Sequence, residues 1–161
     1  MRTEVTFCVD LGQDCVKADT LQREFADYQS QLEAEFPQYG ELILRNDGSG
    51  EIRVRDELAA AVQGICFSSI PQIASGKEYV YTYFSASGRL VFIPSTVFVE
   101  VIGDQVKPAK FRRDTLLPAL YQTGNDYLSL IEKLESEDQR ATAAELGKHR
   151  SPAEEALKAL R

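Results

Sequence analysis

The sequence contains no tryptophan, one methionine, one histidine and three cysteines, and the shortage of histidine and cysteine excludes several kinds of site. A structural zinc site needs several Cys or His ligands at defined spacings, which this chain does not offer. Catalysis by a Ser–His or Cys–His pair is also disfavoured, because the only histidine, His149, would have to reach the core from a polar segment. We therefore expect no catalytic residues, no metal and no cofactor.

The three cysteines, Cys8, Cys15 and Cys66, are an odd number and show no Cys-x-x-Cys spacing. This pattern favours reduced, buried thiols over a framework of disulfides. The first residues lack the apolar stretch and cleavage site of a secretory signal, so we expect a cytoplasmic protein. No segment approaches the ~18 consecutive apolar residues of a membrane-spanning helix, and no membrane partner is expected.

Glycine-rich loops that hold phosphate or calcium are also missing. Gly48-Ser49-Gly50 lacks the third glycine and the strand-to-helix context of a phosphate loop. The stretch from Asp47 to Ile52 resembles the middle of an EF-hand calcium loop, but Arg45 stands at the first ligand position and Asp56 at the last. A guanidinium in a ligand position excludes a buried cation, so these residues are better explained as a hairpin loop.

The net charge is −7, and the whole excess lies in the first half of the chain. Residues 1–76 hold thirteen acidic and six basic residues, whereas the remainder holds twelve of each. Nucleic acid is a poor partner for such a surface, because binding it requires Lys and Arg to neutralise phosphates. A basic protein is a better partner. The alternative is that the charge only keeps a small domain soluble.

The 161 residues suit one α+β domain, and a chain of about 150 residues buries roughly 68–70% of its unfolded surface. Alternation and turn residues predict strands over residues 3–9, 41–45, 51–55, 79–84, 89–93 and 97–102. Helical patterns and caps predict helices over 20–36, 56–64, 114–122 and 127–134 and from 151 onward, with a loop over 66–76. We expect a mostly antiparallel sheet of five to six strands packed by helices, with a single domain over 1–137 and a helical C-terminal extension over 138–161.

The central strand of this expected sheet, residues 79–84, is apolar on both faces. Period-two alternation puts Tyr79, Tyr81 and Tyr83 on one face, together with Leu90 and Phe92 of the following strand. This tyrosine face is either part of the core, with its hydroxyl groups reaching the surface, or an exposed interface anchor.

The first expected helix carries an acidic row beside its apolar stripe. Glu24, Asp27, Gln31 and Glu35 repeat at helical spacing along one edge of that stripe. Such a row is either a solvated face or a surface that attracts a basic partner. We take Glu24, Asp27 and Glu35 as candidate partner-binding residues, together with the three tyrosines.

In its small size, acidity and lack of catalytic motifs, the sequence resembles the class of bacterial toxin-immunity proteins. The resemblance implies a cytoplasmic protein that binds and neutralises a more basic partner, such as a toxin or effector. A secretion-chaperone-like dimer is an alternative within the binding class. A small-molecule-binding protein or enzyme, with its pocket at the tyrosine face, is an alternative of a different class.

Overall fold

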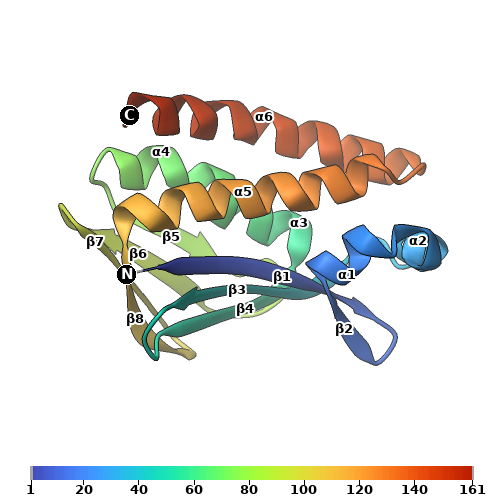
Figure 1. Cartoon of the computed structure of the whole chain (residues 1–161), viewed down its shortest axis with the longest axis horizontal. Helices are drawn as coiled ribbons and strands as arrows, with labels where there is room; N and C mark the ends of the chain where they lie inside the picture. Colours follow the sequence, from blue (N-terminus) through green and yellow to red (C-terminus); the bar gives the residue numbers. More distant parts are fainter. Residues whose placement is uncertain (1, 161) are drawn as a thin grey trace.

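The computed structural model describes residues 2–160 and arranges their strands in two antiparallel sheets (Figure 1). The first sheet has the strand order β2-β1-β3-β4. Its strands are β1 (Thr3–Leu11), β2 (Asp14–Lys17), β3 (Tyr39–Asn46) and β4 (Glu51–Glu57). The second sheet is a meander, β5 (Tyr79–Thr82), β6 (Arg89–Pro94), β7 (Phe98–Gly103) and β8 (Val106–Arg112). Strand β4 of the first sheet lies against β8 of the second.

Helices cover one face of the sheets, and α6 forms an outer layer above them (Figure 1). The helical elements are α1 (Ala18–Arg23), α2 (Phe25–Ala34), α3 (Leu58–Ala61), η1 (Val62–Ser68), α4 (Ser69–Ala74), α5 (Arg113–Glu132) and α6 (Glu137–Ala159). Helix α5 packs on β1 and η1, and α6 packs on α5, α4 and η1. None of these helices is long and apolar enough to cross a membrane.

The expected antiparallel α+β class is confirmed, but the expected single sheet of five to six strands is wrong. The structure has two sheets of four strands, and the sequence patterns did not predict two of these strands, β2 and β8. Strand β8 was missed because it contains Lys107, Pro108 and Lys110, which are not typical of strands. Its Ala109 and Phe111 nevertheless alternate with exposed residues and are buried. Proline and lysine are tolerated there because β8 is an edge strand.

The expected loop over residues 66–76 is also wrong, since this stretch belongs to a continuous helical run. Residues 62–68 form a π-helical segment that leads directly into α4. Pro71 lies inside this continuous run, at the third residue of α4, where it cannot donate a helical hydrogen bond. Ile65, Cys66 and Phe67 are fully buried, so tertiary packing stabilises the helical segment although its Ser and Gly residues have low helix propensity.

Helix α5 continues through Gly124, where we expected one helix to end and another to begin. A Cβ at Gly124 would lie 2.7 Å from the Phe67 ring and 2.9 Å from Cβ of Cys66. The glycine therefore serves close packing between α5 and η1 rather than chain termination. Helix α6 likewise begins after the N-cap Ser136, not at Ser151, and buries Gln139, Leu146 and Ala153.

The expectation of reduced thiols is wrong for two of the three cysteines. Cys8 and Cys15 form a disulfide across the β1–β2 hairpin, with Cα atoms 5.3 Å apart. The hairpin register pairs Cys8 with Lys17 and Asp10 with Cys15, which brings the two cysteines close together. Cys66 is a free thiol in the core, as expected, and burial raises its pKa.

Candidate protein-interaction surface

The predicted acidic row lies on the surface, but it is divided between a helix and its ends. Asp27 lies in α2, whereas Glu24 and Glu35 occupy the two capping positions of that helix. All three side chains are exposed. A single helix over residues 20–36 was expected, and the structure breaks it at Glu24 into α1 and α2.

The turn between α5 and α6 adds a second group of acids beside α2, which sequence reasoning missed. The backbone N–H of Glu135 donates to the Glu33 carboxylate at 2.8 Å, and the side-chain amide of Gln139 donates to the carbonyl of Leu32 at 3.2 Å. These bonds hold the turn against the C-terminal half of α2. The turn and α2 lie at the same end of the molecule (Figure 1). We define the acidic end as Glu24, Asp27, Glu33, Glu35, Glu132, Glu135, Glu137 and Asp138.

Carboxylates outnumber basic groups in the acidic end. Residues 23–35 hold four acids and one basic residue, and residues 132–140 hold four acids and two. Lys133 lies over the Phe25 ring, with its Nζ 5.3 Å from the ring centre. In the described part of the chain, no carboxylate of the acidic end forms an ion pair. Its carboxylates therefore have no ion pair among the described residues, and they exceed the nearby basic residues Arg23, Lys133 and Arg140 in number.

The tyrosine face packs under η1. Tyr79 pairs with Phe92 and Tyr81 with Leu90, which confirms the predicted shared face. Tyr81 is 5% exposed, and a Cβ at Gly64 of η1 would lie 2.7 Å from its ring. Tyr79 and Tyr83 are half-buried beside it. The tyrosines are therefore brought together in the core, away from Glu24, Asp27 and Glu35.

Asp56, which was not predicted as a functional residue, fastens the two sheets together. It is 1% exposed, and its carboxylate accepts hydrogen bonds from the Tyr81 hydroxyl (2.6 Å) and the Phe84 N–H (2.8 Å). The N–H and hydroxyl of Ser85 donate to it at 2.8 and 2.5 Å. Burial raises the pKa of Asp56, but these four bonds favour the charged form more strongly, so its pKa lies below the usual range.

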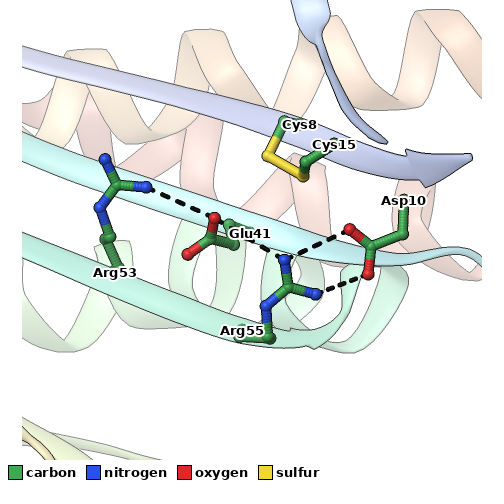
Figure 2. The surroundings of a disulfide bond; sticks show 6 residues. All are labelled: Cys8, Asp10, Cys15, Glu41, Arg53 and Arg55. Carbon is green, nitrogen blue, oxygen red and sulfur yellow. Dashed lines mark hydrogen bonds and ion pairs between the residues drawn. A yellow bond between two sulfur atoms is a disulfide. The ribbon is translucent and has the colours of Figure 1, made fainter. Parts of the chain in front are cut away.

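The outward face of the first sheet carries the disulfide and a row of ion pairs (Figure 2). Arg55 donates to Asp10 at 2.5 Å and lies 3.8 Å from Glu41, while Arg53 lies 3.4 Å from the same Glu41 oxygen. Cys8, Cys15 and Glu41 place their ligand atoms within 4.8 Å of one another, which is close enough for a metal. The sulfurs are bonded to each other and two guanidiniums occupy the carboxylate, so this cluster does not suit a cation.

Ser68, His149 and Glu145 form a chain of polar contacts between η1 and α6. Ser68 Oγ lies 3.3 Å from His149 Nδ1, and His149 Nε2 lies 3.5 Å from Glu145 Oε1. His149 therefore reaches a serine, contrary to the expectation from its polar surroundings. Ser68 lies inside a continuous helical run, whose backbone N–H groups bond within the helix and cannot stabilise an oxyanion. We interpret the contact as one that fastens α6 to η1.

A cavity of about 600 Å³ lies where the start of α5 meets the end of α6. Arg112 on its wall pairs with Asp114 at 2.8 Å, and Arg113 donates to the backbone carbonyls of Ser95 and Ala74. Both guanidiniums are therefore engaged by the protein itself. The lining residues are Thr96, Val97, Arg112, Arg113, Asp114, Pro118, Leu157 and Leu160.

Comparison of the chain with protein-family models, with curated proteins and with solved structures found no significant match.

Proposed function

We propose that this protein binds and neutralises a more basic protein partner, in the manner of an immunity protein that inhibits a bacterial toxin. The acidic end is the observation that supports this proposal most directly, because it gathers carboxylates from α2 and from the α5–α6 turn without ion-pair partners among the described residues. The proposal includes no catalytic activity, no cofactor, no nucleic acid and no membrane.

Exposed charge of one sign accelerates the encounter with a partner of opposite sign. Rim charges act mainly on the association rate, which electrostatic steering raises by about 10- to 1,000-fold at low salt. Their effect weakens once the ionic strength shortens the Debye length to about 8 Å. The acidic end would therefore attract the partner, while buried apolar contacts hold the complex together.

Affinity capture from the native host, including the product of the neighbouring gene, would identify the partner. The capture should be repeated with Glu24→Gln, Asp27→Asn and Glu35→Gln combined in one variant. A matched control combines Glu4→Gln, Asp14→Asn and Glu155→Gln, which are exposed acids outside the acidic end. We expect a basic protein that inhibits growth when produced alone, and weaker capture by the first variant only. Equal capture by both variants, or an acidic partner, would contradict the proposal.

We also propose a cytoplasmic location, and the disulfide offers a test of it. Cytosolic thiol buffers keep cysteines reduced, whereas oxidising compartments preserve disulfides. A cytoplasmic protein should therefore be recovered from rapidly alkylated cells with Cys8 and Cys15 as free thiols. Recovery with the bond intact would place the protein in an oxidising compartment.

A dimer like that of secretion chaperones remains the second candidate, because the outward face of the second sheet carries an apolar row among charged residues such as Glu100 and Lys110. Val80, Val91 and Ile102 form one cross-strand row on this face, and Ile93 and Phe98 lie beside it. Val80 is exposed and the other four are half-buried. Sedimentation of the purified chain separates the candidates: a stable dimer favours the chaperone, and a monomer favours the inhibitor.

A further inference from the structure

Strand β5 presents a free edge to solvent. It pairs with β6 on one side, and no other strand of residues 2–160 pairs with its second side. The Tyr83 N–H donates to the Gly88 carbonyl across the β5–β6 turn. Antiparallel alternation then directs the backbone groups of Tyr81 and Tyr79 toward β6 and those of Val80 and Thr82 toward the free side. Two N–H and two C=O groups are thus available to another strand.

The opposite edge of the same sheet, strand β8, is protected against pairing with another strand, whereas the edge of β5 is not. Strand β8 carries Lys107, Pro108 and Lys110, the residue types that discourage strand pairing at an edge. The side-chain amide of Asn46 also donates to the Lys110 carbonyl at 2.9 Å. Strand β5 has neither lysine nor proline and keeps a regular register with β6.

A groove of about 550 Å³ runs beside the open edge of β5. On the helical side it is bounded by α3, η1 and α6, with Ala59, Ala60 and Leu146 in its lining. Phe84 and Val80 also line the groove, and they are 68% and 45% exposed. These side chains offer apolar area next to the unpaired backbone groups.

The groove is acidic. Glu57 and Glu145 are its charged lining residues, and no Lys or Arg lines it. Burial raises the pKa of Glu57, and the charge of Asp56 raises it further, so a nearby cation would be favoured there. Glu145 is already paired with Lys148 at 3.4 Å and lies 3.5 Å from His149, so Glu57 is the lining carboxylate that has no ion pair among the described residues. A second copy of this chain would bring like charges together, whereas a basic segment complements them.

We propose that an extended segment of the basic partner adds to the free edge of β5 as a further strand. Backbone hydrogen bonds to Val80 and Thr82 would hold the segment, and alternate side chains would face opposite sides of the sheet. Apolar residues would lie beside Val80 on the outward face. Basic residues would lie toward Glu57 and Glu145 on the helical side. This inference rests on the proposed function and names the mode of contact.

The test uses the full chain labelled with ¹⁵N and a synthetic peptide of eight alternating valine and lysine residues. Its matched control is the same peptide with alternate backbone nitrogens methylated, which keeps the charge and removes the donors. We expect the unmodified peptide to shift the amide resonances of Val80 and Thr82 and to slow their exchange with solvent. The methylated peptide should bind at least about tenfold more weakly, because it cannot pair with the edge.

Two variants of Thr82 provide a second control within the protein. Thr82→Pro removes the N–H at the free edge and should weaken peptide binding by about tenfold or more, whereas Thr82→Ala keeps the N–H and should change binding less than threefold. Sedimentation of both variants without peptide reports any pairing of β5 with a second copy.

Each other outcome overturns strand addition by a basic segment. Equal binding of both peptides shows that charge alone suffices, and shifts confined to residues 24–35 and 132–138 place the contact at the acidic end. No binding, or a dimer broken by Thr82→Pro, is equally contrary to the inference. None of these results removes the proposed function, which depends on whether a basic partner is captured through the acidic end.

Discussion

The outward faces of the two sheets differ in the side chains that they expose. The first sheet presents paired charges, with Arg45, Arg53 and Arg55 bridged to Asp10, Glu41 and Glu51, and a disulfide ties its edge strand β2 to β1 (Figure 2). The second sheet presents an apolar row on the same kind of face and leaves the edge of β5 open.

This difference separates a surface suited to water from one suited to a partner. Exposed ion pairs satisfy their charges and offer little apolar area to another protein. An apolar face beside unpaired backbone groups gains stability when another chain covers it. The acidic end lies on neither face, so under the proposed function different parts of the molecule would steer and hold the partner.

The largest expected effect comes from Asp56, which couples the two sheets. Asp56→Ala leaves the donors of Tyr81, Phe84 and Ser85 without their acceptor, and we expect a loss of about 3 kcal/mol in the free energy of unfolding. Asp56→Asn keeps the shape and one carbonyl oxygen and should lose less. Urea denaturation measures both. A loss under 1 kcal/mol for the alanine variant would show that the sheets do not depend on this carboxylate.

Acid should weaken the same junction. The pKa of Asp56 lies below its usual range in the folded protein, so its contribution is present above the unfolded pKa of about 3.9 and disappears as the pH falls through the lower folded value. The difference in stability between wild type and Asp56→Ala should therefore be constant near neutral pH and shrink below about pH 4. A difference that grew on acidification would contradict this assignment.

A smaller effect is expected from opening the disulfide of the first sheet. Combining Cys8→Ser with Cys15→Ser removes a cross-link between residues seven positions apart, which should cost about 2 to 3 kcal/mol by restoring freedom to the unfolded chain. Thermal unfolding with and without a reductant measures this cost. The reductant should destabilise the wild type and leave the double variant unchanged. An equal response of both proteins would assign the effect to something other than this bond.

The ion pairs on the first sheet should matter less again. Arg55 is largely exposed, and Arg55→Ala should lower the free energy of unfolding by at most about 1 kcal/mol, with the loss shrinking as salt rises. Arg45→Ala is a matched control because it pairs with Glu51 alone among these acids. Urea denaturation at low and high salt measures the loss in the free energy of unfolding for the Arg55→Ala and Arg45→Ala variants. A loss that persists at high salt would indicate packing of the Arg55 stem rather than charge.

The smallest effect on stability is expected on the apolar face of the second sheet. Val91→Thr keeps the β-branched shape in the middle of the Val80–Val91–Ile102 row, and we expect a change within about 0.5 kcal/mol. Any self-association of the wild type should fall in this variant, as sedimentation would show. A loss above about 1 kcal/mol would mean that this face belongs to the core.

Local sequence patterns predicted the elements whose side chains alternate cleanly. The hairpin of β3 and β4 is confirmed around Asn46, whose side-chain oxygen accepts the N–H groups of Gly48 and Gly50. The shared face of Tyr81 and Leu90 followed from strand parity alone and is also confirmed. In both cases neighbouring residues determine the structure.

The remaining features depend on contacts between distant residues, and sequence patterns do not report those. From the sequence alone, Gly124 predicts the end of a helix. In the structure it lies inside α5 and allows close contact with Phe67. From the sequence alone, Asp56 predicts a helix cap. In the structure its carboxylate instead accepts hydrogen bonds from the hydroxyl groups of Tyr81 and Ser85. Only the α2 part of the acidic end was predicted, because the contacts of Glu135 with Glu33 and of Gln139 with Leu32 join residues about a hundred positions apart.

Association kinetics test the central claim most directly. The rate constant for binding of the captured partner should be measured by stopped flow from about 20 mM to about 500 mM ionic strength. Binding steered by the acidic end predicts a fall of more than about tenfold over this range, and a variant with Glu24→Gln, Asp27→Asn and Glu35→Gln that loses much of the low-salt rate with little change in dissociation. A rate constant that is the same at both extremes and in both proteins would contradict the account.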